Sequence, residues 1–177
     1  MPLKRPSSIS LNKERRSFRY FVDRNLGFYL LPDQLRRAGI EIVVHDDIYP
    51  PNERDPWIFY QCGVQRLVVI TSDADFRKSF PHMAAVVLGK TSVIAFSRND
   101  YKSEVRGNAF IKARTDIEKA LRMHKGKYFI GVVGMNGVFR ICDESPLPSR
   151  KTCDPKDWKS FDLVCRSAGK LPLAPLH

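Results

Sequence analysis

The chain has 177 residues, 43% of them hydrophobic, and carries a formal net charge of +11 at pH 7. This length suits one domain with short extensions, and the apolar content excludes a disordered chain. No segment approaches the roughly 20 apolar residues that cross a bilayer, and the N-terminus lacks the apolar core of a secretory signal. We therefore expect no membrane association and a cytoplasmic protein. The charge favours a polyanionic partner such as nucleic acid, although a basic surface alone does not identify one.

Composition divides the chain into three regions. Residues 1–16 form a basic N-terminal arm that we expect to be flexible, and residues 17–143 form the predicted domain. Residues 144–177 form a basic tail whose prolines argue against regular structure. The four cysteines show neither C-x-x-C spacing nor a nearby histidine pair, so we assign them no function.

Strand and helix patterns alternate along the predicted domain. In chain order they predict a strand at 18–23, a helix at 31–38, a strand at 40–44, a helix at 55–63 and an almost wholly apolar strand at 67–71. There follow a helix at 80–88, a strand at 91–96, a long amphipathic helix within 101–124, and strands at 128–133 and 138–142. Asn136-Gly137 between the last two strands predicts a hairpin turn. This alternation predicts an α/β fold with a mostly parallel sheet covered on both faces and a C-terminal β-hairpin.

Acidic residues stand where three of the predicted strands end. Asp23 ends the first strand, Asp46 and Asp47 follow the second, and Asp73 and Asp75 follow the third. The carboxyl ends of parallel strands lie at one edge of a sheet, where such folds bind their ligands. Clustered carboxylates repel one another, and a divalent cation relieves that repulsion. Oxygen ligands without histidine or cysteine suit Mg²⁺ or Mn²⁺, which can activate water against a phosphodiester.

A plainer interpretation of these aspartates stays open. Aspartates often follow strands because they form turns and cap helices, and Asp73 can cap a short helix over 74–78. The histidines His82, His124 and His177 form no recognisable constellation, and His45 is expected to finish the second strand.

The ordered segments FVDRNLG, LPDQLRRAGIEIVVHDD, DPWIFY and LVVITSDADF resemble the PIN-like domains. The resemblance is greatest to the subset related to VapC-type toxins that opens with Asp-Arg-Asn-Leu-Gly, and it covers roughly residues 18–142. It implies a three-layer PIN-like fold and a metal-dependent endoribonuclease that hydrolyses RNA with a metal-activated water. It also implies, as expectations, the toxin role of a toxin–antitoxin pair, a cognate antitoxin partner and a homodimer.

The resemblance also implies site residues, carried over by position. The catalytic ligands of Mg²⁺ or Mn²⁺ would be Asp23, Asp55, Asp73 and Asp75. Supporting residues would be Asn25, Asp46, Asp47 and Thr71. A basic surface beside the cluster would guide RNA through Arg24, Arg77 and Lys78.

Two departures from the family pattern leave a second interpretation open. Asp55 stands on the middle helix where many PIN toxins have Glu, and Arg24 directly follows the first aspartate, where it could neutralise part of the site. The alternative function is therefore a catalytically inactive PIN-like module that binds RNA or acts as a scaffold. A different phosphoryl-transfer fold is less consistent with the sequence, because the D-x-D of Toprim domains accompanies a glutamate after the first strand, where Asp23 stands.

Overall fold

The computed structural model describes residues 17–27, 29–73, 75–142 and 155–168. The predicted arm at 1–16 and most of the predicted tail lie outside these residues. The strands are β1 (Arg19–Val22), β2 (Glu41–Val44), β3 (Leu67–Thr71), β4 (Ser92–Phe96), β5 (Phe129–Val133) and β6 (Phe139–Cys142). The α-helices are α1 (Leu30–Arg37), α2 (His45–Ile48), α3 (Asp55–Val64), α4 (Phe80–Gly89), α5 (Ser103–Met123) and α6 (Pro155–Ser167). Two 3₁₀ helices, η1 (Arg24–Leu26) and η2 (Asp75–Lys78), follow β1 and β3.

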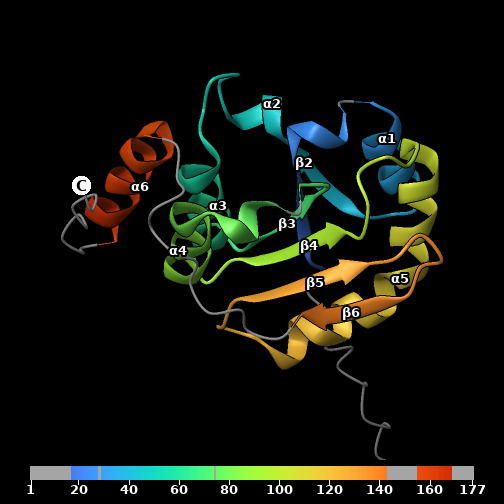
Figure 1. Cartoon of the computed structure of the whole chain (residues 1–177). Coiled ribbons are helices and arrows are strands. Elements are labelled where there is room, and N and C mark those ends of the chain that lie inside the picture. Colours follow the sequence, from blue (N-terminus) through green and yellow to red (C-terminus); the bar gives the residue numbers. More distant parts are fainter. Residues whose placement is uncertain (1–16, 28, 74, 143–154, 169–177) are drawn as a thin grey trace, which may run out of the picture.

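One six-stranded sheet, in the order β2-β1-β3-β4-β5-β6, forms the centre of the molecule (Figure 1). β1 to β5 pair in parallel, and β6 pairs antiparallel to β5. The turn between them is closed by a hydrogen bond from the Gly134 N–H to the Val138 carbonyl. The predicted mostly parallel sheet and C-terminal hairpin are confirmed. None of the described helices is both long and apolar enough to cross a membrane.

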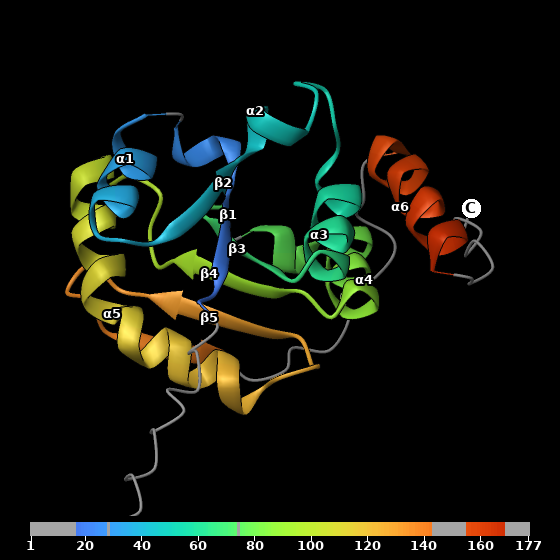
Figure 2. The ribbon, with the colours of Figure 1, turned by 180° about the vertical axis from the view of Figure 1, so that it is seen from behind.

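Helices cover both faces of the sheet and make three layers, as Figures 1 and 2 show from opposite sides. Side chains alternate between the two faces along each strand. Tyr20 and Val22 of β1 therefore join the core under α1 and α5, whereas Phe21 joins the core under α3 and α4. The same alternation sends Val69 of β3 to the α3/α4 side.

Helices α3 and α4 approach one another almost backbone to backbone. A Cβ atom at Gly63 would collide with the Gly89 carbonyl oxygen, and one at Gly89 would come within 2.8 Å of the Tyr60 carbonyl oxygen. Thr91 seals the end of this contact by donating its hydroxyl to the Phe59 carbonyl at 2.6 Å. Glycine at both positions is what allows the last turns of α3 and α4 to lie close together.

The expectation that the tail lacks regular structure is wrong for residues 155–167, which form α6. A proline at the first position of a helix has no N–H to leave unpaired, so Pro155 starts this helix instead of preventing it. Figure 1 shows α6 outside α3 and α4. The ring of Phe161 packs edge-on against Phe80 with centroids 5.9 Å apart, and the hydroxyl of Ser160 accepts a hydrogen bond from the Trp57 N–H at 3.2 Å.

Docking of α6 predicts a large loss of stability on truncating its buried aromatic residue. Phe161→Ala is expected to lower the free energy of unfolding by about 3–5 kcal/mol, because it removes a buried ring from the contact with α4. Leu163→Ala, on the exposed side of the same helix, is the matched control and should cost less than about 1 kcal/mol. Chemical denaturation of both variants measures the difference, and equal small effects would mean that α6 does not pack on the domain.

Candidate functional site

The site forms at the carboxyl ends of β1 and β3. In the strand order β2-β1-β3-β4-β5 the chain changes direction across the sheet between these two strands, and parallel sheets bind ligands in the crevice at that point. Val22 pairs with Ile70, and the Asp23 N–H continues the ladder to the Ile70 carbonyl at 3.0 Å. Asp23 therefore lies beside Thr71. By strand alternation both side chains point to the face that α3 and α4 cover.

The Thr71 hydroxyl connects three site residues. It donates to Asp23 Oδ2 at 2.6 Å and accepts from the Asn25 amide at 3.3 Å and from the Asp73 backbone N–H at 3.0 Å. A hydroxyl has one hydrogen and two lone pairs, so these three bonds use its whole capacity. Since Thr71 is fully buried, no water competes for these bonds, and the hydroxyl holds Asp23 and the start of the following loop in fixed positions.

Asn25 extends this network to the first residue of the loop after β3. Its side-chain oxygen accepts from the Ser72 N–H at 3.3 Å and from the Ser72 hydroxyl at 3.1 Å. The amide thus joins η1 to the end of β3, and the two strand ends that carry Asp23 and Asp73 form one unit.

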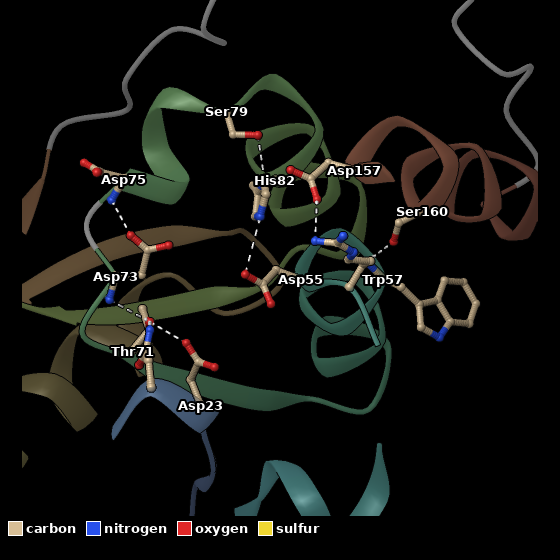
Figure 3. A network of polar contacts seen from close by, with 12 residues as sticks. Asp23, Asp55, Trp57, Thr71, Asp73, Asp75, Ser79, His82, Asp157 and Ser160 are labelled. Carbon is tan, nitrogen blue, oxygen red and sulfur yellow. Dashed lines mark hydrogen bonds and ion pairs between the residues drawn. The ribbon is translucent and has the colours of Figure 1, made fainter. Parts of the chain in front are cut away.

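A second carboxylate comes from α3. Pro56 at the second position of this helix suits its first turn, and Asp55 at the first position brings a negative charge to the positive end of the helix dipole. Figure 3 shows the Asp23 and Asp55 carboxylates pointing toward one another at the end of the sheet.

Desolvation by burial raises the pKa of the Asp23 carboxyl from 3.8 to about 6. The Thr71 hydrogen bond lowers this pKa, the Asp55 carboxylate raises it, and the Arg24 N–H and His45 lower it. Behind Asp23 lies the buried thiol of Cys62, whose pKa is raised by burial and then by the Asp23 carboxylate. Asp23 is therefore an anion held between an apolar floor and a second anion, which is the electrostatic condition that a cation relieves.

The other predicted acidic residues are placed differently. Asp73 follows β3, and its Oδ1 accepts from the Asp75 N–H at 2.7 Å, which is the capping role that the plainer interpretation foresaw. Asp75 itself is exposed and forms an ion pair with Lys78 at 2.6 Å. The predicted second strand ends at Val44, one residue before His45.

His45, Asp46 and Asp47 begin α2 instead of finishing the strand. Asp46 pairs with His45 at 2.8 Å, and Asp47 accepts from the Val44 N–H at 3.4 Å. These two aspartates thus contribute to the start of α2.

The three basic residues assigned to RNA have contacts within the protein. Arg24 donates to the Pro51 carbonyl at 2.5 Å, and Arg77 donates to the Cys142 sulfur at 3.5 Å. Lys78 remains at the surface in its pair with Asp75. Arg24 acts on the Asp23 carboxyl through its backbone N–H.

The acidic side chains of the site are of a type that divalent metals bind. Within the described ranges, no three or more His, Cys, Asp or Glu side chains gather closely enough to enclose an ion. Mg²⁺ keeps several waters and is commonly bound through one or two carboxylates together with substrate phosphates, so it needs no such enclosure. The mutually repelling pair Asp23 and Asp55, with Asp73 tied to the same hydroxyl as Asp23, fits Mg²⁺ or Mn²⁺ in ligand type and in charge.

Sequence reasoning missed one residue of this site, His82. Its ring is buried, with Nε2 3.5 Å from Asp55 Oδ2 and Nδ1 2.6 Å from the Ser79 hydroxyl (Figure 3). A signal existed in the topology, because α4 follows β3 and must therefore begin at the edge where β3 ends. A histidine in the first turn of that helix is brought to the acidic residues without any motif marking it.

The raised pKa predicts an unusual pH dependence of stability. The folded protein holds the Asp23 proton up to about pH 6 and the unfolded chain only to about 3.8, so this group makes stability fall as pH rises through that window. Asp23→Asn is therefore expected to raise the free energy of unfolding at pH 7, by on the order of 2 kcal/mol, and to flatten the pH profile.

Carboxyl NMR titration in EDTA checks the cause directly. The Asp23 signal should titrate near pH 6, and Thr71→Val should move the midpoint higher because it removes the hydrogen bond that favours the anion. A midpoint near 4 in the wild type would contradict the desolvation of Asp23.

Comparison with known proteins finds one similarity, in the segment that carries this site. No curated protein and no solved structure matches the chain. Residues 18–98, from β1 through β4, match a family model described as a PIN like domain. The match contains Asp23, Asp55, Asp73 and His82, and it does not extend to α5, the hairpin or α6. This segment is therefore similar to PIN-like domains, among which nucleases are common, and the VapC-type subset stays a prediction.

Proposed function

We propose that the protein is a metal-dependent ribonuclease in which Asp23, Asp55 and Asp73 hold Mg²⁺ or Mn²⁺ at the ends of β1 and β3. The observation that carries the proposal is the pairing of the desolvated Asp23 carboxyl with the Asp55 carboxylate at the switch point of the sheet. Such a pair weakens the folded protein at neutral pH unless a cation binds, so a role other than stability is the better explanation for it.

The residues of the site have separable roles in this proposal. Asp23 and Asp55 bind the cation, and Thr71 keeps Asp23 oriented and ionised through its 2.6 Å hydrogen bond. The bound metal supplies Lewis-acid stabilisation of phosphodiester charge and lowers the pKa of water. Asp73 contributes its second carboxylate oxygen, because its first is occupied by the Asp75 N–H. Asp75, paired with Lys78 at the surface, is proposed to act at the edge of the site and not at its centre.

RNA is the proposed substrate because of the charge of the chain and the basic residues beside the cluster. The net charge of +11 attracts a phosphate backbone, and Arg24, Arg77 and Lys78 follow the two strand ends that carry the acidic residues. The toxin role, the antitoxin partner and the homodimer rest on the resemblance alone and stay predictions.

The proposal predicts cleavage of RNA that needs both metal and the aspartates. A mixed pool of single-stranded and structured RNA should be cut with Mg²⁺ or Mn²⁺ and left intact with EDTA. Asp23→Asn and Asp73→Asn should each lower the rate by about 100-fold or more, because each removes a charged ligand. Asp116→Asn, an exposed aspartate on α5 at the opposite face of the sheet, is the matched control and should cut like the wild type.

The same experiment separates the second candidate function, an inactive module that binds RNA or acts as a scaffold. The contacts that Asp73 and Asp75 already make within the protein, with the Asp75 N–H and with Lys78, favour this candidate. An inert wild type that binds RNA with steep salt dependence would support it. Metal-dependent cutting that persists in Asp23→Asn and Asp73→Asn would instead show that the activity lies elsewhere.

A further inference from the structure

His82 lies in the first turn of α4 and its side chain contacts α3. Both of its ring nitrogens face polar groups, which packing in an apolar core would not require. It is 7% exposed and packs edge-on against Phe59, with ring centroids 5.9 Å apart. Its two nitrogens meet polar groups from different elements, the Ser79 hydroxyl at 2.6 Å and the Asp55 carboxylate at 3.5 Å. Figure 3 shows the three side chains in a row, Ser79 to His82 to Asp55.

The Ser79 hydroxyl does not make the helix-capping hydrogen bond that is usual for a serine at its position. It stands at the N-cap of α4, where a serine hydroxyl usually accepts from a backbone N–H of the first turn. No such bond forms here, and the hydroxyl engages His82 instead. The three-residue spacing places both side chains on one face of the helix start. The hydrogen bond between Ser79 and His82 thus takes the place of a side-chain cap at the start of α4.

The chemistry of the two partners decides which way the ring donates. A neutral imidazole has one N–H donor and one acceptor nitrogen, and a hydroxyl can act as either partner. An ionised Asp55 carboxylate only accepts. Both contacts are favourable when Ser79 donates to Nδ1 and the Nε2–H faces the Asp55 carboxylate, 3.5 Å away. The opposite tautomer would set a nitrogen lone pair against the carboxylate, so Asp55 selects the Nε2–H form.

We propose that His82 is a positioning residue, which fixes one oxygen of Asp55 through its Nε2–H and leaves the other oxygen for the metal at the site. This inference rests on the proposed function insofar as Asp55 is a metal ligand. Hydrogen-bonded partners of this kind orient metal-binding side chains and commonly alter metal affinity by 10–100-fold. The starts of α3 and α4 lie side by side, as the contact between Asp55 and His82 shows, and Gly63 and Gly89 let the last turns of the same helices approach closely.

Two amide substitutions test whether the Nε2–H of His82 donates to Asp55. In His82→Gln the amide nitrogen takes the place of Nε2 and can still donate to Asp55, whereas in His82→Asn it takes the place of Nδ1 and faces Ser79. Mn²⁺ affinity of the full chain, measured by calorimetry, should stay within about threefold of wild type in His82→Gln. It should fall about 10–100-fold in His82→Asn and in His82→Leu. The Gln and Asn variants are both polar, so their comparison remains valid if His82→Leu does not fold.

A second readout needs no metal at all. Nitrogen NMR of the imidazole in EDTA, at a pH where the ring is neutral, should show the proton on Nε2. A proton on Nδ1, or unchanged Mn²⁺ affinity in His82→Asn, would overturn the inference.

Asp55→Asn separates this failure from failure of the proposed function. If Asp55→Asn binds Mn²⁺ like the wild type, Asp55 is not a ligand and the proposed metal site is wrong. If Asp55→Asn loses Mn²⁺ while every His82 variant keeps it, the metal site stands and the positioning role of His82 is wrong.

Discussion

The parallel pairing of β1 with β3 is the constraint on which the rest of the site depends. The register Val22 to Ile70 places Asp23 beside Thr71, and the Asp23 N–H continues the ladder by one more bond. Because the two strands are parallel, the loops that follow them leave from the same edge and carry Asn25 and Asp73 with them. A shift of one residue would turn Asp23 to the face under α1 and α5 and away from Asp55.

Desolvation and hydrogen bonding act in opposite directions on the pKa of Asp23. Burial disfavours the Asp23 anion and the Asp55 carboxylate disfavours it further, while the Thr71 hydroxyl and the Arg24 N–H favour it. The balance leaves a carboxyl with a pKa of about 6. The Thr71 hydroxyl has no spare hydrogen-bonding capacity. A change at Asp23 that moves this hydroxyl therefore also alters its hydrogen bonds with the Asn25 amide and the Asp73 N–H.

The α3/α4 layer supplies the second half of the site. Asp55 begins α3 and His82 lies in the first turn of α4, and glycines allow these helices to approach closely. α6 packs on the outside of the same layer, where Ser160 accepts from the Trp57 N–H and Asp157 lies 4.0 Å from Arg54. The C-terminal helix therefore supports the first turn of the helix that carries Asp55, although it lies outside the segment that matches the PIN-like family model.

Local sequence patterns determined the type and order of the elements in the domain. The apolar run at 67–71, the prolines near the starts of α3 and α4 and the Asn-Gly turn each act through neighbouring residues, so the strands, helices and hairpin could be predicted from them. The placement of Asp23 and Asp73 at strand ends followed from the same patterns. Only the tertiary structure decided which carboxylates interact, since the electrostatic repulsion between Asp55 and Asp23 and the contact of Asp55 with His82 join three separate elements. It also decided that Asp75 turns to Lys78 and that residues 155–167 fold onto α3 and α4. Burial and hydrogen bonding across elements have no local signature in a chain, and these two effects set the pKa of Asp23 and the role proposed for His82.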